Sequence, residues 1–196
     1  FRTGSDTGQL VVVPYLRHRG LRALDRLVVS HDDDDHKGGA PSVLALLPTL
    51  TVVPGPSVLA RALEAATADQ VPGRCRRGQA WTWDGVQFRW LHPGSEPHAR
   101  DNDSSCVLLV QAGAHTLLLT GDIEADAERE MLATGAVPAV DVMIVPHHGS
   151  RTSSTPAFVA AVAAHHVVFT AGHRNRFGHP RADVVERYVR RGAATY

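Results

Sequence analysis

The feature of this sequence that most limits what it can fold into is a cluster of histidines and aspartates after a short apolar run. The run is Leu-Val-Val at residues 27–29, and the cluster reads Ser-His-Asp-Asp-Asp-Asp-His from Ser30 to His36, with two glycines after Lys37. A Val- and Leu-rich run that ends at turn residues is typical of a buried strand. In α/β proteins, residues just past the C-terminal end of a strand are the usual ligand-binding residues. We therefore expect a ligand-binding loop at residues 30–39.

The side chains of this cluster predict a metal site. If the segment is extended, His31, Asp33 and Asp35 alternate and point to the same side, and His36 follows at a bend. Imidazole and carboxylate together suit zinc, manganese or iron, and the carboxylates shift the preference toward the harder ions. The alternative is a solvated acidic loop, as most runs of like charge are. The histidine at each end and the glycine pair favour the metal site.

The overall composition fits one globular domain. The chain has 196 residues, of which 43% are hydrophobic, so we expect a single domain over residues 1–196 with a sizeable core. It contains no apolar run of roughly 18 residues, the length that spans a bilayer. It begins at Phe1 with no recognisable signal peptide, and we expect it to be a piece of a longer protein.

The charge distribution is uneven although the net charge is zero. Zero net charge argues against a generally basic nucleic-acid binder. From Arg151 onward, however, seven arginines accompany only two acidic residues, Asp183 and Glu186. A local excess of this kind attracts phosphates. Ordinary helix surface has the same composition, and the sequence leaves both interpretations open.

Apolar periodicity and turn residues predict alternating helices and strands. The expected helices cover residues 9–19, 40–47, 57–66, 124–132, 156–164 and 182–191. The expected strands cover residues 27–30, 51–53, 106–110, 116–120, 140–145 and 167–170. This alternation predicts a layered α/β sandwich.

A β-hairpin is expected in the middle of the chain, because the Asp84-Gly85 pair is a strong signal for a two-residue turn. Its two arms carry four aromatic residues: Trp81, Trp83, Phe88 and Trp90. Such a row either stacks on nucleic-acid bases or forms part of the core. The core is the commoner outcome and is the one we expect.

Two more apolar runs end in polar residues suited to metal chemistry. Asp122 follows the run at residues 117–119, where it either binds two cations as a bridge or caps the next helix. His147 and His148 follow the run at residues 142–145. One of them is expected at the metals or the scissile phosphate, and the other is expected to shape the loop. Because an α/β sheet gathers such strand ends at one edge, the clusters support one another.

Phosphate-binding candidates follow these histidines. Ser150 and the backbone N–H groups beside it suit phosphate oxygens. Arg174 and Arg176 suit phosphate because a guanidinium binds it through two hydrogen bonds, and Arg151 flanks the same loops. His179 closes the second loop before a helix. The remaining histidines lie in polar or helix-end settings and are expected on the surface: His18, His98, His115, His165 and His166.

Together these motifs resemble the nuclease-like domain of the ComEC family of DNA-uptake (natural competence) proteins, which has the metallo-β-lactamase fold. The landmarks run from V-V-V-P-Y-L at residues 11–16 to N-R-F-G-H-P at residues 175–180, which is nearly the whole chain. Between them lie S-H-D-D-D-D-H-K-G-G, W-D-G-V, L-H-P, D-N-D-S-S-C-V-L, L-T-G-D-I-E and V-P-H-H-G-S-R-T-S-S. The resemblance implies an αββα sandwich.

The resemblance also implies a site for two divalent metal ions, manganese or zinc. Its ligands would be His31, Asp33, Asp35, His36, Asp122 and a late histidine, for which His179 fits best and His147 is the rival. The sequence departs from the family in two ways. The third-motif histidine of the wider superfamily is missing, with His92 and Asn102 as nearby substitutes, so the first metal is expected to be held weakly. The strand pair with Gly-Gln-Gly-Asp that usually comes first is absent.

The chemistry expected from these residues is metal-dependent hydrolysis of a phosphodiester. Asp35 and Asp122 would hold the metals, and either could orient the nucleophile. His147 or His148 would protonate the leaving group as a general acid. The resemblance implies a deoxyribonuclease that degrades the DNA strand not taken up.

The same resemblance implies a cellular setting. The domain would be the soluble part of an integral membrane protein, on the extracytoplasmic (periplasmic) face of the inner membrane. Its partners would be DNA, the membrane channel domain of the same longer chain and the competence machinery, with no small-molecule organic cofactor. Cys75 and Cys106 alone suit either one bridge in an oxidising compartment or two buried thiols. An extracytoplasmic location implies the bridge.

Two alternatives remain at this stage. Fold does not fix substrate, and the same fold hydrolyses lactams, lactones, thioesters and small phosphodiesters. Arg174 and Arg176 favour a phosphate substrate among these. The other alternative is a catalytically idle module that guides DNA in the uptake channel, which the missing third-motif histidine favours.

Overall fold

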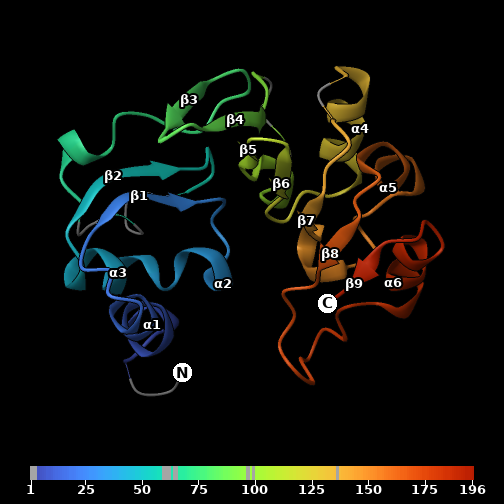
Figure 1. Cartoon of the computed structure of the whole chain (residues 1–196). Coiled ribbons are helices and arrows are strands. Elements are labelled where there is room, and N and C mark those ends of the chain that lie inside the picture. Colours follow the sequence, from blue (N-terminus) through green and yellow to red (C-terminus); the bar gives the residue numbers. More distant parts are fainter. Residues whose placement is uncertain (1–3, 59–62, 64–65, 96–97, 99, 136) are drawn as a thin grey trace. The chain divides into compact units, whose positions relative to one another are not determined.

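The computed structural model describes the chain except for residues 1–3, 59–62, 64–65, 96–97, 99 and 136 (Figure 1). Contacts within the chain divide it into two compact units, Phe1–Cys75 and Arg76–Tyr196, and each is described by itself. The expected helix at residues 57–66 lies largely outside the described residues. The expectation of a single domain over the whole chain stays a prediction.

The first unit combines short helices with a two-stranded parallel sheet. Its helical elements are η1 (Gly8–Val12), α1 (Val13–His18), α2 (Asp34–Lys37), α3 (Ala40–Leu46) and η3 (Ala68–Gln70), and its strands are β1 (Leu24–Val29) and β2 (Thr49–Pro54). The parallel pairing aligns Val28 with Val53. The expected helix at residues 9–19 is confirmed as η1 followed by α1, and Pro14 lies in the first turn of α1, where its missing N–H costs no hydrogen bond.

Apolar side chains fix α3 against β1 in this unit. Val43 and Leu47 pack with Val13, and the partly buried Leu24 and Leu27 of β1 pack against that cluster. Figure 1 shows α3 along β1 and β2. The glycine pair that precedes α3 has a steric cause, because a Cβ on Gly39 would lie 2.7 Å from the backbone nitrogen of Gly8.

The second unit is built on one seven-stranded sheet in sequential order. The strands are β3 (Ala80–Trp83), β4 (Val86–His92), β5 (Val107–Ala112), β6 (His115–Leu119), β7 (Val142–Ile144), β8 (His166–Val168) and β9 (Ala194–Thr195). From β3 to β6 the pairing is antiparallel, and from β6 to β9 it is parallel. Among the described strands of this sheet, only β9 was not predicted from the sequence.

The change from antiparallel to parallel pairing follows from the connections. Parallel neighbours need a crossover, and a helix lies in each one. These helices are α4 (Ala125–Ala133), α5 (Pro156–Val162) and α6 (Ala182–Val189), with the short turns η4 (Asn102–Ser104) and η5 (Pro146–Gly149) before and after α4. Buried residues of the helices and strands form one core, which includes Leu118, Met131, Met143, Phe158 and Tyr188. Thr155 caps α5 as expected, since its side chain accepts a hydrogen bond from the N–H of Phe158.

The aromatic hairpin is confirmed, but only part of its aromatic row is core. Asp84 and Gly85 have φ values of 48° and 81°, as a type I′ turn requires. Trp90 is buried, whereas Trp83 is 40% exposed. Trp81 and Phe88 stack on each other with ring centroids 5.0 Å apart. The core expectation is therefore right for Trp90 and wrong for Trp83, because Trp90 lies closer to the centre of the sheet.

Both cysteines are disulfide-bonded, which confirms the expectation of a bridge. Cys75 ends the first unit, and Cys106 directly precedes β5. Within the described part of the chain, no helix is both long enough and apolar enough to cross a membrane.

Asp103 holds the start of α4. Its Oδ1 atom accepts hydrogen bonds from the backbone N–H groups of Glu124 at 2.9 Å and Ala127 at 3.1 Å. The first N–H groups of a helix have no partner within the helix, so a buried carboxylate from another segment satisfies them.

We expect Asp103→Ala to lower the free energy of unfolding by about 1–3 kcal/mol, because it leaves two buried N–H groups without an acceptor. Urea denaturation measures this. The control is Asp126→Ala in the first turn of α4, where the exposed carboxylate pairs with Arg129. It should change the free energy of unfolding by less than about 0.5 kcal/mol. Equal effects of the two substitutions would contradict the role of Asp103.

Candidate metal centre

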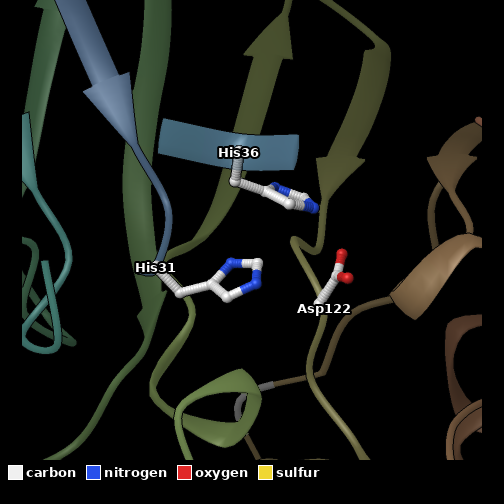
Figure 2. A group of neighbouring side chains, drawn as sticks. All are labelled: His31, His36 and Asp122. Atoms are coloured by element: carbon white, nitrogen blue, oxygen red, sulfur yellow. The ribbon is translucent and has the colours of Figure 1, made fainter. Parts of the chain in front are cut away.

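The loop after β1 holds two imidazole rings side by side. The ring centroids of His31 and His36 are 4.2 Å apart, and Figure 2 shows the two side chains next to each other. The hydroxyl oxygen of Ser30 lies 3.1 Å from the Nδ1 atom of each ring. A hydroxyl oxygen has two lone pairs and can accept an N–H from both rings. This arrangement leaves the two Nε2 atoms as the metal-binding nitrogens, the pattern in which ligating histidines are usually held.

The backbone of this loop differs from the expected extended segment. Residues Asp34–Lys37 form the one-turn helix α2, with Asp33 as its N-cap residue. Simple alternation of His31, Asp33 and Asp35 is therefore wrong. A run of four aspartates with a lysine after it can close one helical turn, since Asp34 lies three residues before Lys37 and pairs with it at 3.5 Å.

The four aspartates of the loop divide into two pairs. Asp32 and Asp34 both lie within salt-bridge distance of Lys37, Asp32 at 3.0 Å. Asp33 and Asp35 instead lie beside histidine nitrogens, Asp33 at 3.6 Å from Nε2 of His31 and Asp35 at 3.9 Å from Nε2 of His36. The carboxylates at Asp33 and Asp35 are thus the ones placed for a metal.

In the second unit, Asp122 follows β6 and lies beside His148. Its Oδ2 atom is 3.3 Å from Nε2 of His148. The Nδ1 atom of His148 is 3.1 Å from the carbonyl oxygen of Thr170, and since a carbonyl only accepts, this nitrogen carries the proton. Nε2 of His148 therefore faces the carboxylate of Asp122. Figure 2 also draws Asp122.

The alternative role of Asp122 as a helix cap is not found. The N-cap residue of α4 is Glu124, and no side-chain cap bond is made there. The N–H groups of the first turn are bound by Asp103 instead. The carboxylate of Asp122 is therefore not used by the helix.

Two consecutive left-handed residues direct the histidines after β7. His147 and His148 have φ values of 48° and 54°, and Gly149 follows with 83°. Residues other than glycine rarely adopt this left-handed backbone conformation, and those that do cluster at functional sites. Only glycine fits at residue 149, because a Cβ there would lie 2.8 Å from the Phe169 ring and from Pro180. The expectation from an extended exit was that one histidine faces the site; in this turn both face a carboxylate.

Glu124 is the carboxylate that His147 faces, and the sequence analysis missed it. Its Oε1 atom lies 3.1 Å from Nδ1 of His147 and accepts a hydrogen bond from Thr152 at 2.9 Å. Arg100 donates to Oε2 at 2.6 Å and Asn102 to Oε1 at 3.3 Å. Burial alone would raise the pKa of Glu124, but these hydrogen bonds lower it below its usual value. An ionised Glu124 orients the His147 ring so that Nδ1 faces the carboxylate. The sequence pattern that could have indicated Glu124 is G-D-I-E, which has two acidic residues at alternate positions after one strand.

His179 offers a neutral ring to the same group of residues. Its ring centroid is 5.8 Å from that of His147. Burial, together with the nearby His147 and His148, lowers the pKa of His179. Asn175 binds the backbone of His179 on both sides, accepting from its N–H at 3.0 Å and donating to its carbonyl at 2.6 Å. Among the residues that the structure describes, none hydrogen-bonds to the buried Nδ1 of His179. A neutral imidazole with such a nitrogen fits a metal ligand.

The predicted phosphate ligands differ in how far their own neighbours occupy them. Ser150 is buried, with its hydroxyl 3.0 Å from that of Thr152. Arg151 lies 3.3 Å from Asp183. Arg174 and Arg176 are exposed, and neither pairs with a carboxylate among the described residues.

Arg176 places its guanidinium 4.7 Å from the centre of the Phe177 ring. A guanidinium stacked in this way is held in position and keeps its hydrogen-bond donors available. The stacking keeps the guanidinium donors of Arg176 available, and its phosphate role, like that of Arg174, stays a prediction. The phosphate role of Ser150 and Arg151 stays a prediction.

The two substitutes for the missing third-motif histidine have other contacts. Asn102 donates a hydrogen bond to Glu124 at 3.3 Å, and so helps to hold the carboxylate that faces His147. His92 contacts Ser105 through Nδ1 and His98 through Nε2. Neither was expected to make these contacts.

This sequence is similar to known proteins over most of its length. The Metallo-beta-lactamase superfamily matches residues 3–173. Competence protein ComA of Neisseria gonorrhoeae is 36% identical over 190 residues, which cover 95% of this chain and 26% of that protein. Recombination protein 2 of Haemophilus influenzae is 33% identical over 187 residues, 95% of this chain and 22% of that protein. The chain thus spans about a quarter of the length of these relatives.

A solved structure shows the same fold. The metallo-beta-lactamase fold protein YhfI of Bacillus subtilis aligns with a TM-score of 0.62 over 98% of this chain and 80% of its own, at 12% identity. This chain belongs to the metallo-β-lactamase superfamily, whose members are generally metal-dependent hydrolases. Members of the superfamily bind divalent metals such as zinc or iron. Within it, the chain matches a domain of competence proteins, so the expected fold and the resemblance to the ComEC family are confirmed.

Proposed function

We propose that this domain is a metal-dependent deoxyribonuclease of a DNA-uptake protein and that it degrades the strand that is not transported. The observation that carries the proposal is the group of strand-end residues in the second unit, in which His148 lies 3.3 Å from Asp122 and His147 lies 3.1 Å from Glu124. The names of the relatives, a competence protein and a recombination protein, support a DNA substrate.

Two divalent ions, manganese or zinc, are the proposed cofactors. The first unit would supply His31, Asp33, Asp35 and His36, and the second would supply Asp122 with His148 or His179. His147, the rival of His179 as a ligand, is assigned a proton-transfer role instead. The basis for assigning each set to metal binding is membership of the superfamily. The donor set fits, because neutral imidazoles and carboxylates bind both ions and the carboxylates favour manganese.

The residues of the chain have distinct parts in the proposed reaction. Bound divalent cations would make a water acidic and withdraw charge from the phosphate. Asp35 or Asp122 would orient the attacking water. Glu124 stabilises a protonated His147 through Nδ1, so that Nε2 can give its proton to the leaving alkoxide. This division makes Glu124 a positioning residue and His147 the general acid.

The proposed setting is the extracytoplasmic face of the inner membrane, with the channel domain of the same longer chain and the competence machinery as partners. Two facts support it. Disulfides persist in oxidising compartments, and both cysteines are disulfide-bonded. The chain also covers only 22–26% of the two relatives, as a domain of a longer protein would.

Asp35→Ala should reduce the bound metal and slow plasmid cleavage by about 100-fold or more, since even partners of metal ligands contribute 10–100-fold. Elemental analysis after dialysis and a plasmid-nicking assay measure the two effects. The matched control is Asp34→Ala, which removes a neighbouring carboxylate that is 97% exposed and lies beside Lys37. Unchanged metal content in Asp35→Ala, or equal losses in the two variants, would contradict the ligand assignment.

A second prediction concerns the substrate. If Arg176 binds a flanking phosphate, Arg176→Ala should slow DNA cleavage several-fold and reduce the slope of log affinity against log salt by about 0.7–0.9. Hydrolysis of a small aryl phosphodiester should stay unchanged, because that substrate has no flanking phosphate.

The control for this experiment is Arg190→Ala, an exposed arginine of α6 that pairs with Glu186. It should leave both substrates and the salt slope unchanged. If Arg176→Ala slows both substrates equally, the domain is still a metal hydrolase, but the proposed contact to DNA is wrong.

A further inference from the structure

A second group of metal-ligand side chains lies within the second unit, apart from the strand-end residues described above. It consists of His92 at the end of β4, His98 in the loop that follows, and Glu130 on α4. Nε2 of His98 is 3.0 Å from Nε2 of His92 and 3.0 Å from Oε2 of Glu130. Nε2 of His92 is 3.8 Å from the same oxygen. Three ligand atoms therefore converge on one point.

This group was not predicted from the sequence. His98 was expected on the surface, and this is wrong, since its side chain is only 13% exposed. His92 is completely buried. The spacing of the three residues gave no signal, because Glu130 comes from a helix more than thirty positions along the chain.

The proton positions on His92 can be assigned from its other contact. Nδ1 lies 2.9 Å from the carbonyl oxygen of Ser105, and it must donate because a carbonyl only accepts. Burial of the ring lowers the pKa of His92, which favours the neutral form. Nε2 of the neutral ring is then a lone pair directed at His98 and Glu130. A histidine that donates its other N–H to a backbone carbonyl is the usual arrangement of a metal ligand.

Glu130 is also held in a ligand orientation. Arg77 donates to Oε1 at 2.6 Å, which leaves Oε2 toward the two histidines. Gly94 allows this approach, because a Cβ there would collide with Oε1 of Glu130 and would lie 2.9 Å from the Arg77 guanidinium. Two of the three candidate ligands therefore have the supporting partner that oriented metal ligands have.

The distances are compatible with ligands around a tetrahedral ion as well as with a hydrogen-bonded trio. Ligands at about 2.1 Å from a tetrahedral zinc ion are about 3.4 Å from one another. The three observed separations, 3.0, 3.0 and 3.8 Å, lie on both sides of that value. Without an ion, a single proton on Nε2 of His98 would serve two acceptors at the same distance.

We propose that His92, His98 and Glu130 bind one zinc ion, through Nε2 of each histidine and Oε2 of the glutamate. Two nitrogens and one carboxylate are a known zinc set, which leaves a fourth position for water. Two imidazoles favour zinc over magnesium or calcium. The ion would tie the loop after β4 to α4, the helix whose start carries Glu124. This site does not depend on the proposed nuclease function.

The test measures zinc bound to the whole 196-residue chain, with zinc alone as the probe. The starting variant carries Asp35→Ala and Asp122→Asn, which remove two carboxylates proposed to bind the other metals. His98→Ala or Glu130→Gln is then added to this variant. Zinc per chain after dialysis should fall by one on adding either substitution, and zinc affinity at this site should fall at least about tenfold. The matched control is His115→Ala at an exposed histidine of β6, which should leave both values unchanged.

The same comparison in the otherwise unchanged chain keeps the test decisive if the combined variants fail to fold. There, His98→Ala should remove one zinc and abolish part of the rise in melting temperature caused by zinc, whereas His115→Ala should not. Equal zinc content with and without His98 would overturn the proposal and leave a hydrogen-bonded trio. Loss of cleavage with this zinc retained would count against the proposed function alone.

Discussion

The parallel pairing of β6, β7 and β8 is the constraint on which the rest of the site depends. Parallel strands end at the same edge of a sheet, and each of these is followed by polar residues rather than by a hairpin. Asp122 follows β6, His147 and His148 follow β7, and the segment to His179 follows β8. The observed contacts, such as Asp122 with His148, are the result of that pairing.

Three glutamates in and just before α4 make three different kinds of contact. Glu124 is held ionised by hydrogen bonds and orients His147. Glu128, one turn later and fully buried, accepts the backbone N–H groups of Ser154 and Thr155 just before α5, and burial raises its pKa. Glu130 faces away toward His98. In and just before this short helix, Glu128 thus binds backbone N–H groups, whereas Glu124 and Glu130 contact histidine rings.

Much of this could be predicted from the sequence, because strand ends and turn residues carry local signals. The order of elements, the Asp84-Gly85 turn and the polar residues at the strand ends all come from patterns a few residues long. The turn at His147 and His148 could not be predicted, since its left-handed backbone depends on packing of Gly149 against Phe169 and Pro180. The partners of Asp103, Glu124 and Glu130 lie on other segments, and no local pattern encodes such contacts. Membership of the superfamily supplies the class of chemistry, while the substrate rests on the proposal.

The most direct test of the central claim uses the unaltered chain and supercoiled plasmid DNA. The protein is stripped with EDTA, dialysed, and assayed for nicking before and after manganese or zinc is restored. A metal-dependent nuclease should not cleave the plasmid after stripping and should recover activity with one of these ions. Cleavage that persists in EDTA, or metal binding with no cleavage under any of these conditions, would contradict the proposed function.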